Sequence, residues 1–440
     1  MAKYSTYIEL SPNYESVVDI NSDERNPDMW YDYIVNEDIR LAIEKIYDSI
    51  QYENKDARRS FWIQGAYGTG KSYAAIVIKH LFEEPIKNVD KFFSGKEILR
   101  AYKNKFTAIR EKGDFLVIWK SGTSDVSTGT QLMMAIELDI RRALEKKFSR
   151  KAYYGRNSLV DAVKEKINDK SYNWELLFEA TQYGLSEDYP TLDSFKQEIV
   201  NGNIKACNQA AEICRDKGWA LFNTVDTFEA WVKDVIEGNK LQDSGIIFIW
   251  DEFSNYVWDN GSDNILQRIS EYCKQQPLFM FFIVHLDASK VKDMGEKTYE
   301  RILQRYHELE FHVTENAAYD LIGNSILTRK GMDSTWKTKK DKLIKSIEKN
   351  FPEFDNLQLS NLREKFLSLC PIHPMTLTLL ATVAQNFGAS QRTLFRFMKD
   401  ASEENENVGF RYYIKNYGPD DWRWLTPDFP GIIFLPEKAI

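Results

Sequence analysis

The sequence predicts an α/β fold: a doubly wound, mostly parallel β-sheet that carries a helical insertion and is followed by an all-helical domain. The chain has 440 residues, which is enough for two or three domains that each bury a core. Short apolar runs alternate with helical stretches over the first two thirds of the sequence, and this alternation is typical of a parallel sheet with helices on both faces.

The composition is that of a globular protein. Hydrophobic residues make up 43% of the chain and charged residues 28%, and the formal net charge of −8 argues against a surface that binds nucleic acid throughout. The four cysteines show no CxxC spacing, so we expect free thiols and a cytoplasmic protein. The N-terminal sequence lacks the pattern of a secretory signal, and no apolar run is long enough to span a bilayer, so no membrane partner is expected.

Five apolar runs of strand length predict the sheet. They are Phe61–Ile63, Phe115–Trp119, Ile246–Trp250, Leu278–Val284 and Leu309–Val313. Helices are expected between them at Ser72–Phe82, Thr128–Phe148, Asn264–Gln275 and Thr298–Tyr306. A short extended piece at Tyr7–Leu10 and a helix at Glu37–Ile50 precede the sheet, so we expect residues 1–58 to form an N-terminal segment.

Two helical regions complete the expected organisation. Residues 150–240 contain several amphipathic stretches and no convincing strand, which predicts a helical insertion between the second and third strands. After Val313 the pattern is wholly helical, so a core at residues 59–314 is followed by a helical lid and tail at 315–440. The helices expected there are Ala317–Leu327, Lys340–Asn350, Leu362–Leu369, Met375–Phe387 and Arg392–Ala401.

A complete phosphate-loop motif follows the first strand of the sheet. Its residues match G-x-x-x-x-G-K-[ST] between a predicted strand and a predicted helix, which is the context that this motif requires. They are Gly65, Ala66, Tyr67, Gly68, Thr69, Gly70, Lys71 and Ser72. Glycines allow the backbone to direct N–H groups at a phosphate, and the helix that begins here adds the positive end of its dipole. We therefore expect Lys71 to reach the β- and γ-phosphates of ATP and Ser72 to bind Mg²⁺, with Tyr73 also at the nucleotide.

Two acids end the third predicted strand. Asp251 and Glu252 follow the apolar run Ile246–Trp250 directly. In a phosphate-loop enzyme Asp251 would hold Mg²⁺ through its water shell, and Glu252 would orient or deprotonate the attacking water. The alternative is an exposed turn with two solvated acids. Together with the phosphate loop, the pair predicts ATP hydrolysis with Lys71, Asp251 and Glu252 as catalytic residues.

These motifs resemble those of the AAA+ superfamily of P-loop NTPases, especially its origin-recognition-like branch. Gly65 to Ser72 and the Asp251–Glu252 pair are similar to the two Walker motifs, and the run Tyr33–Asp38 resembles the segment that packs against adenine. The resemblance therefore implies that Ile34 and Val35 contact the base. The helical region after Val313 resembles the AAA+ lid.

A narrower resemblance is to the large ATPases of bacteriophage-exclusion phage-defence systems. It is carried by the stretch Trp62–Ser72, by Asp251-Glu252-Phe253, by Pro371-Ile372-His373-Pro374 and by Gln391-Arg392-Thr393-Leu394-Phe395. The resemblance covers about residues 5–425, and such proteins are usually much longer. We therefore expect either a compact relative or an N-terminal portion of a larger protein, with other subunits of a defence complex as partners.

Two arginines are candidates for contacts with the γ-phosphate. Arg305, with Arg301 in reserve, lies in a run that resembles the motif presenting an arginine finger to a neighbouring subunit, which would imply a homo-oligomer. Arg392 stands at the start of a predicted lid helix, where a sensor arginine would act. Each of the two is otherwise a solvated helix charge. His285, at the end of the fourth strand, occupies a sensor position, although a structural role is the simpler interpretation.

The lysine-rich stretch Arg329–Lys349 would suit contacts with DNA phosphates, but a solvated helix face is the preferred interpretation. The function predicted first is an ATPase whose hydrolysis drives conformational change or assembly in a prokaryotic defence complex, acting on or near DNA. The alternative is a nucleotide-dependent loader or signalling switch with slow turnover, and a third interpretation is a scaffold that keeps ATP for structure.

Overall fold

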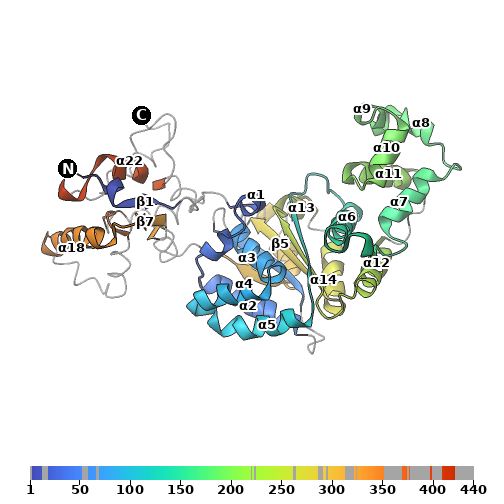
Figure 1. The fold of residues 1–440 in the computed structure, drawn as a ribbon. Helices are drawn as coiled ribbons and strands as arrows, with labels where there is room; N and C mark the ends of the chain where they lie inside the picture. The colour runs from blue at the N-terminus through green and yellow to red at the C-terminus, as the bar shows by residue number, and fades with distance from the viewer. Residues whose placement is uncertain are drawn as a thin grey trace. The chain divides into compact units, whose positions relative to one another are not determined.

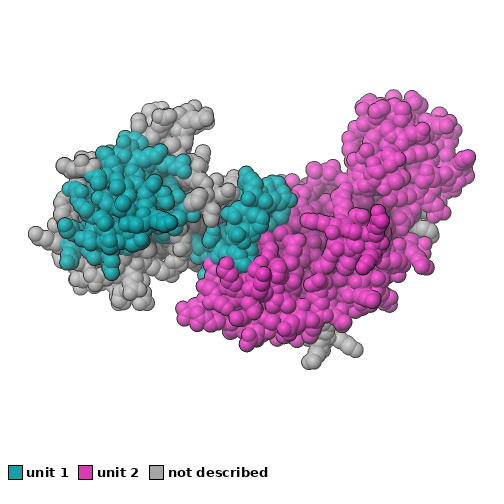
Figure 2. Space-filling view, in the orientation of Figure 1, with its two compact units in different colours: residues 1–36, 65–76, 311–440 teal, residues 37–64, 77–310 magenta. Residues whose placement is uncertain are grey.

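The computed structural model forms two units, which Figure 2 shows in different colours. Unit 1 comprises residues 1–36, 65–76 and 311–440, and unit 2 comprises residues 37–64 and 77–310. The residues that the structure describes are 2–11, 18–51, 58–65, 69–219, 221, 224–260, 264–285, 291–293, 296–312, 322–323, 325–350, 369–373, 376, 397–398 and 409–421.

A five-stranded parallel sheet forms the centre of unit 2. Its strands are β2 (Ser60–Gly65), β3 (Leu116–Ser121), β4 (Ile246–Asp251), β5 (Leu278–His285) and β6 (His307–Glu310). They lie in the order β3-β4-β5-β2-β6. The five predicted strands and the α/β class are thus confirmed, although β6 begins two residues earlier than expected and the predicted end at Val313 lies outside the described residues.

The central strands are apolar on both faces because helices cover both sides of the sheet. All residues of β4 are buried, and in β5 only His285 is partly exposed. Figure 1 shows α2 (Glu37–Ile50), α4 (Ile86–Gly95) and α5 (Lys103–Lys112) on one side of the sheet. On the other side lie α6 (Gly129–Phe148), α13 (Ser254–Asn260) and α14 (Ile265–Gln275). This arrangement is the doubly wound one.

Helices α4 and α5 were not expected from the sequence. Each is only 10 residues long, and a 3-10 turn at Glu97–Tyr102 separates them. Their buried phenylalanines, Phe92, Phe93 and Phe106, pack on one another and on Phe82. Tertiary packing of a few aromatic side chains stabilises these short helices. The apolar residues of α4 follow a helical spacing, whereas α5 is mostly polar and has a weaker helical period.

The described residues from 150 to 240 contain helices and no strand, in agreement with the sequence. The helices are α7 (Leu159–Asn168), α8 (Trp174–Phe178), α9 (Leu185–Asp188), α10 (Leu192–Val200), α11 (Ile204–Asp216) and α12 (Thr224–Gly238). We call this region, α7 to α12, the insertion.

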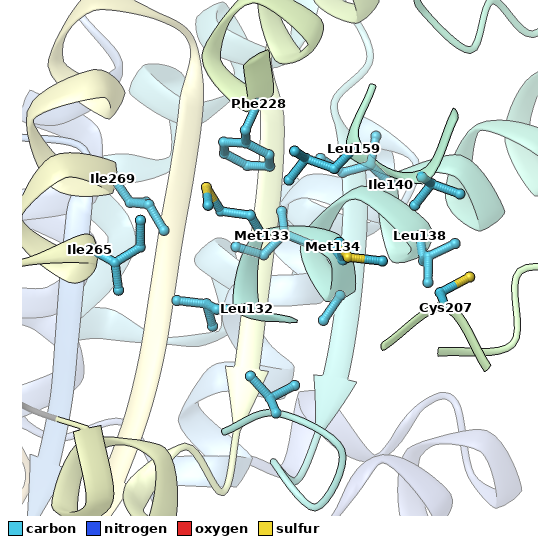
Figure 3. Close-up of a cluster of buried hydrophobic side chains, with 14 of the residues drawn as sticks. Leu132, Met133, Met134, Leu138, Ile140, Leu159, Cys207, Phe228, Ile265 and Ile269 are labelled. Atoms are coloured by element: carbon cyan, nitrogen blue, oxygen red, sulfur yellow. The ribbon is translucent and has the colours of Figure 1, made fainter. Parts of the chain in front are cut away.

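Helix α6 joins the insertion to the sheet through one shared core. Its buried side chains include Leu132, Met133, Met134 and Leu138, and Figure 3 shows them beside residues from several other elements. Cys207 and Phe228 come from the insertion, whereas Ile265 and Ile269 come from α14. Because protein cores are close-packed, the insertion and the sheet form one packed body around α6.

In unit 1, the N-terminus pairs with a strand that follows residue 313. The two strands, β1 (Ile8–Leu10) and β7 (Ile326–Thr328), are antiparallel and place Ile8 opposite Thr328. The prediction that the chain is wholly helical after Val313, with a helix over Ala317–Leu327, is therefore wrong at Ile326–Leu327. A three-residue strand has no readable period, and its partner is far away in sequence, so the helical pattern around it hid the strand.

Residues 2–10 complete the core of the C-terminal segments. Tyr4 stacks on Tyr413, and Tyr7 stacks on Trp336. Trp336 belongs to α18 (Asp333–Asn350) and Tyr413 to α22 (Gly409–Asn416). The predicted helices Leu362–Leu369, Met375–Phe387 and Arg392–Ala401 lie almost wholly outside the described residues. None of the helices described has both the length and the apolar character that crossing a membrane requires.

His307 gives unit 2 a dependence on pH. Burial, with the positive charges of Lys45 and Arg58, lowers the pKa of His307 to about 4. Below the unfolded value of about 6.5, the unfolded chain binds a proton that the folded chain does not, so stability falls as the pH falls from 6.5 towards 4. We expect this residue alone to cost about 1 kcal/mol of unfolding free energy between pH 7 and pH 5.5. Urea unfolding of the wild type and of His307→Gln at both pH values measures this difference. If the unfolding free energy of the two proteins fell equally between pH 7 and pH 5.5, this role for His307 would be excluded.

Candidate functional site

The phosphate-loop residues lie between a strand and a helix, as the motif requires. Gly65 is the last residue of β2, and α3 (Lys71–Glu83) begins at the lysine of the motif. Thr69 to Tyr73 are described, whereas Ala66, Tyr67 and Gly68 lie outside the described residues. The strand–loop–helix order predicted from the sequence is therefore present.

Two glycines of the loop are needed for steric reasons. A Cβ atom on Gly65 would lie 2.4 Å from the backbone oxygen of Phe311 and 2.9 Å from the Thr69 hydroxyl oxygen. Gly70 has a φ of 84°, a conformation that residues with a side chain rarely adopt. The chain therefore passes close to other backbone at Gly65 and enters the helix through a left-handed residue.

Lys71 is buried at the start of a helix. Its side chain is 3% exposed, and its ammonium group donates a hydrogen bond of 2.8 Å to the carbonyl oxygen of Gly65. The positive end of the helix dipole disfavours a cation at this position, and burial adds to the cost. A bound anion offsets both effects, so this end of α3 is suited to a phosphate group.

The residues predicted to contact the base are tied to the same helix within unit 1. The Tyr73 hydroxyl donates a hydrogen bond of 2.5 Å to the carbonyl oxygen of Met29. The Tyr73 ring also meets the ring of Tyr33 edge-on, with centroids 5.0 Å apart. Ile34 and Val35, which follow Tyr33, are half-buried. The structure thus connects the first turn of α3 with the segment that the sequence assigns to adenine.

The two predicted acids form a tight turn at the end of β4 in unit 2. Asp251 is 5% exposed, and its Oδ1 atom accepts a hydrogen bond of 2.8 Å from the backbone N–H of Glu252. Glu252 is exposed and has a φ of 56°, which is uncommon for a residue that is not glycine. Such strain is retained where the surroundings hold it, and it concentrates at functional sites. We call residues 251–254 the acid turn.

Both neighbouring strands hold the acid turn. On the β3 side, the backbone N–H of Gly122 donates to the carbonyl oxygen of Asp251 at 2.9 Å. On the β5 side, the N–H of Phe253 donates to the carbonyl oxygen of Ile283 at 3.0 Å, and the N–H of His285 donates to the Ser254 hydroxyl oxygen at 2.8 Å. The turn is therefore fixed by bonds that do not depend on a ligand.

The strand order brings three strand ends to one edge of the sheet. Strand β5 lies between β4 and β2, and the strands are parallel, so Asp251, His285 and Gln64 stand at the same, carboxyl edge. His285 therefore occupies the position between the acid turn and the strand that leads into the phosphate loop. Ligands of open α/β sheets bind outside this edge.

The donor atoms available suit Mg²⁺. Among the described residues, no group of three or more His, Cys, Asp or Glu side chains is placed to hold a metal. Mg²⁺ is commonly held by one or two protein oxygens together with water and substrate phosphates. The Ser72 hydroxyl in unit 1 and the Asp251 carboxylate in unit 2 are each a hard oxygen donor of the kind that Mg²⁺ prefers, whereas zinc sites use mainly Cys and His.

The structure gives the arginine candidates different surroundings. Arg305 forms an ion pair with Glu271 of α14, with 2.6 Å between Nη1 and Oε1, and its side chain is 38% exposed. Hydrogen bonds from Lys274 and Arg305 lower the pKa of Glu271. Arg301 is exposed on α16 (Glu296–Leu303), and Arg392 lies outside the described residues. The finger and sensor roles remain predictions.

The polar groups that hold the acid turn are not recognisable from the sequence. Ser254 and Gly122 contribute a hydroxyl oxygen and a backbone N–H, and Trp250 contributes a buried indole whose N–H donates to Gly122. In the sequence, a tryptophan within an apolar strand is interpreted as a core residue, and a serine shortly after two acids is interpreted as part of a turn. Only the tryptophan directly before Asp251 offered a signal, because a buried indole N–H usually needs an acceptor.

Gly65→Ala tests the close approach at the phosphate loop. The added methyl group would overlap the oxygen of Phe311, so the loop has to move; we expect a loss of about 1–3 kcal/mol of unfolding free energy and weaker ATP binding. Thermal unfolding and titration with a fluorescent ATP analogue measure the two effects. Gly95→Ala is the matched control, because a Cβ there meets nothing within 4 Å. Unchanged ATP affinity in Gly65→Ala would show that the loop does not form the phosphate site.

No protein-family model, no curated protein and no solved structure matches this chain. The resemblance to AAA+ proteins is therefore carried by the motifs alone. The function has to be argued from the phosphate loop and the acid turn themselves.

Proposed function

We propose that the chain is a Mg²⁺-dependent ATPase of the P-loop, AAA+-like type. The observation that carries this proposal is the acid turn: Asp251 ends β4, and a strained Glu252 follows it, at the edge of the sheet where β2 also ends. The complete phosphate-loop motif follows β2 directly in the sequence. In this proposal the phosphate loop and the acid turn act together at that edge, as phosphoryl transfer to water in P-loop enzymes requires.

Each residue has a definite role in this proposal. Lys71 and the first N–H groups of α3 bind the β- and γ-phosphates and neutralise their charge. Mg²⁺, when bound, supplies further neutralisation of the phosphate oxygens, and Ser72 and Asp251 would hold it. The carboxylate of Glu252 orients a water molecule for attack on the γ-phosphorus and accepts its proton. The exposure of Glu252 suits this role, because a water molecule can reach its carboxylate.

The same proposal assigns the base to the segment tied to Tyr73. Ile34 and Val35 provide half-buried apolar side chains next to Tyr33, and apolar contacts of this kind suit a purine ring. The contacts of Tyr73 with Met29 and Tyr33 link this segment to the helix that carries Lys71. Binding of the base and binding of the phosphates therefore involve one connected part of unit 1.

Lys71→Ala and Glu252→Gln separate binding from hydrolysis. We expect Lys71→Ala to weaken ATP binding at least tenfold, because a charge-assisted contact to phosphate is lost. Glu252→Gln should keep ATP affinity while turnover falls by about 10²–10³-fold, since the proton acceptor is removed. Equilibrium titration with ATP and Mg²⁺ and a phosphate-release assay measure the two quantities. Turnover in Glu252→Gln equal to that of the wild type would contradict the role of the acid turn.

The ion pair of Arg305 favours the alternative of a slow nucleotide switch. In the chain by itself, Arg305 is held by Glu271, so a finger role requires this pair to open when a second copy docks. Turnover would then be slow in the monomer and would depend on assembly, as in a loader or signalling switch. An exposed ion pair of this kind contributes little stability, so its opening is energetically accessible.

Arg305→Ala tests the shared site. If Arg305 acts on the nucleotide of a neighbouring copy, its loss should reduce turnover of the assembled protein by about 10³-fold. Glu271→Gln, which frees Arg305, should leave turnover unchanged or raise it. Lys297→Ala is the control, because Lys297 is an exposed charge on α16, the helix that precedes Arg305. Native mass spectrometry with phosphate release across a concentration series provides the measurement, and an Arg305→Ala protein as active as the wild type excludes the finger.

The biological setting proposed is a prokaryotic anti-phage defence complex in the cytoplasm. It rests on the resemblance of the Walker motifs and of the His373 and Arg392 segments to the ATPases of phage-exclusion systems. Other subunits of that complex, and DNA, are the partners proposed. Stimulation of phosphate release by duplex DNA would favour a motor, whereas ATP-dependent assembly with slow release would favour the switch.

A further inference from the structure

We propose that residues 122–128, the loop between β3 and α6, position the acid turn, and that Trp250 and Asn208 are the positioning residues of this device. Trp250 links the loop to β4, and Asn208 links it to the insertion. The inference rests on the proposed function, because it assigns these residues to the hydrolysis in which Glu252 takes part. It extends that function by connecting the insertion with the acid turn.

Trp250 and Asp251 bind the two sides of a single residue. The fully buried indole of Trp250 donates a hydrogen bond of 2.8 Å to the carbonyl oxygen of Gly122. The backbone N–H of Gly122 donates a bond of 2.9 Å to the carbonyl oxygen of Asp251. Both the N–H and the C=O group of Gly122 are therefore held by hydrogen bonds. Gly122 has a φ of 75°, a conformation that favours glycine. Any displacement of the loop at Gly122 therefore moves the backbone of Asp251.

The acid turn needs this support because its conformation is unfavourable on its own. Glu252 keeps a positive φ while its N–H donates to the Asp251 carboxylate. If the backbone of Asp251 moves, that bond is lost and Glu252 can relax to a more common conformation. The carboxylate of Glu252 would then no longer lie where it orients water, and a misplacement of about 1 Å in such a group can reduce a rate 100-fold.

A second contact fixes the indole itself. The ammonium group of Lys120 lies over the Trp250 ring, 5.1 Å from its centroid. Lys120 also pairs with Asp139 of α6 at 3.2 Å, and both side chains are largely buried. The cation on the ring holds the indole in the orientation in which its N–H reaches Gly122.

Asn208 connects the same loop to the insertion. Its side-chain amide, on α11, donates a hydrogen bond of 2.6 Å to the carbonyl oxygen of Asp125. Its own Oδ1 atom is buried and has no hydrogen-bond partner among the described residues. An unsatisfied buried acceptor is costly, and an apolar side chain of similar size would avoid this cost. The bond to Asp125 is therefore what joins this side chain to the loop, and a leucine of similar size would lack it.

The loop between these two anchor points is short and ordered by its own hydrogen bonds. The N–H of Val126 donates to the carbonyl oxygen of Thr123 at 3.0 Å. Ser127 donates from its N–H and from its hydroxyl to Oε1 of Gln131, at 2.7 and 2.8 Å, so the loop is joined to the first turn of α6. If α11 moves, Asn208 moves Asp125, which is only three residues from Gly122. A partner that binds the insertion would alter ATP turnover by this route.

Trp250→Phe removes the indole N–H and keeps an aromatic ring. We expect its turnover number to fall by about tenfold with an unchanged KM for ATP, because the turn and not the nucleotide contacts is disturbed. Hydrogen exchange of the Gly122 and Glu252 amides should become faster in the protein without ATP. Trp174→Phe is the matched control, since the Trp174 indole also donates a 2.8 Å bond to a backbone carbonyl, that of Lys166. This control should leave turnover and both amides as in the wild type.

Asn208→Leu separates positioning from stability. It removes the bond to Asp125 together with the unsatisfied oxygen, so we expect an unchanged or higher melting temperature and turnover reduced several-fold. A residue with a purely structural role would move both quantities in the same direction. Asn168→Leu is the control, because Asn168 makes a 2.8 Å amide-to-carbonyl bond on α7, within the insertion, and it is exposed.

The outcomes distinguish this inference from the proposed function. In one outcome, turnover of the wild type depends on Glu252, but the turnover numbers of Trp250→Phe and Asn208→Leu both lie within twofold of the wild type. This outcome overturns the inference and leaves the proposed ATPase function standing. Faster exchange at Glu252 in Trp250→Phe, with no hydrolysis by the wild type, supports the positioning and contradicts the ATPase. Exchange at Gly122 and Glu252 that is unaffected by Trp250→Phe overturns the positioning whatever the turnover is.

Discussion

The parallel pairing of β4 with both of its neighbours is the constraint on which the rest of unit 2 depends. The register places Ser121 opposite Asp251 on the β3 side and Trp250 opposite Phe282 on the β5 side. Parallel strands end at the same edge, so this pairing sets the acid turn between Gly122 and His285. The fully buried residues of β4 hold the register, because a slip by one residue would exchange its two apolar faces and move Asp251 away from this edge.

Much of the fold can be predicted because its signals are local. Five apolar runs predict the five strands, and the phosphate-loop motif predicts a strand before it and a helix after it. The pairing of β1 with β7 has no such signal: it joins Ile8 to Thr328 across most of the chain, and three residues carry too little periodicity. Helices α4 and α5 were not predicted, although the spacing of the apolar residues in α4 is a local signal for a helix. Only α5 lacks such a signal, because it is mostly polar and its contacts with α4 stabilise it.

The residues of the candidate site also fall into those that a local sequence pattern reveals and those that it does not. Lys71, Asp251 and Glu252 are recognised in the sequence because their chemistry requires them at a fixed spacing. The partner of Arg305 is not recognisable from the sequence, because Glu271 lies on α14, 34 residues earlier in the chain, and no local pattern links two residues at this separation. Trp250 and Asn208 are hidden for a different reason. Each acts through one N–H···O bond to a backbone carbonyl, and the size and burial of both side chains are explained equally well by packing.

Departures from the rules of stable folding help to locate function where sequence does not. Glu252 adopts a left-handed conformation without being glycine, and the buried Oδ1 atom of Asn208 accepts no hydrogen bond within the described part of the chain. Each departure is unfavourable by itself, and each is joined to the loop at residues 122–128, one through Asp251 and the other through Asp125. Local rules are broken where function requires it, and the surrounding structure offsets the cost. The loop at residues 122–128 therefore connects the two departures, which is the link that positioning of the acid turn by the insertion requires.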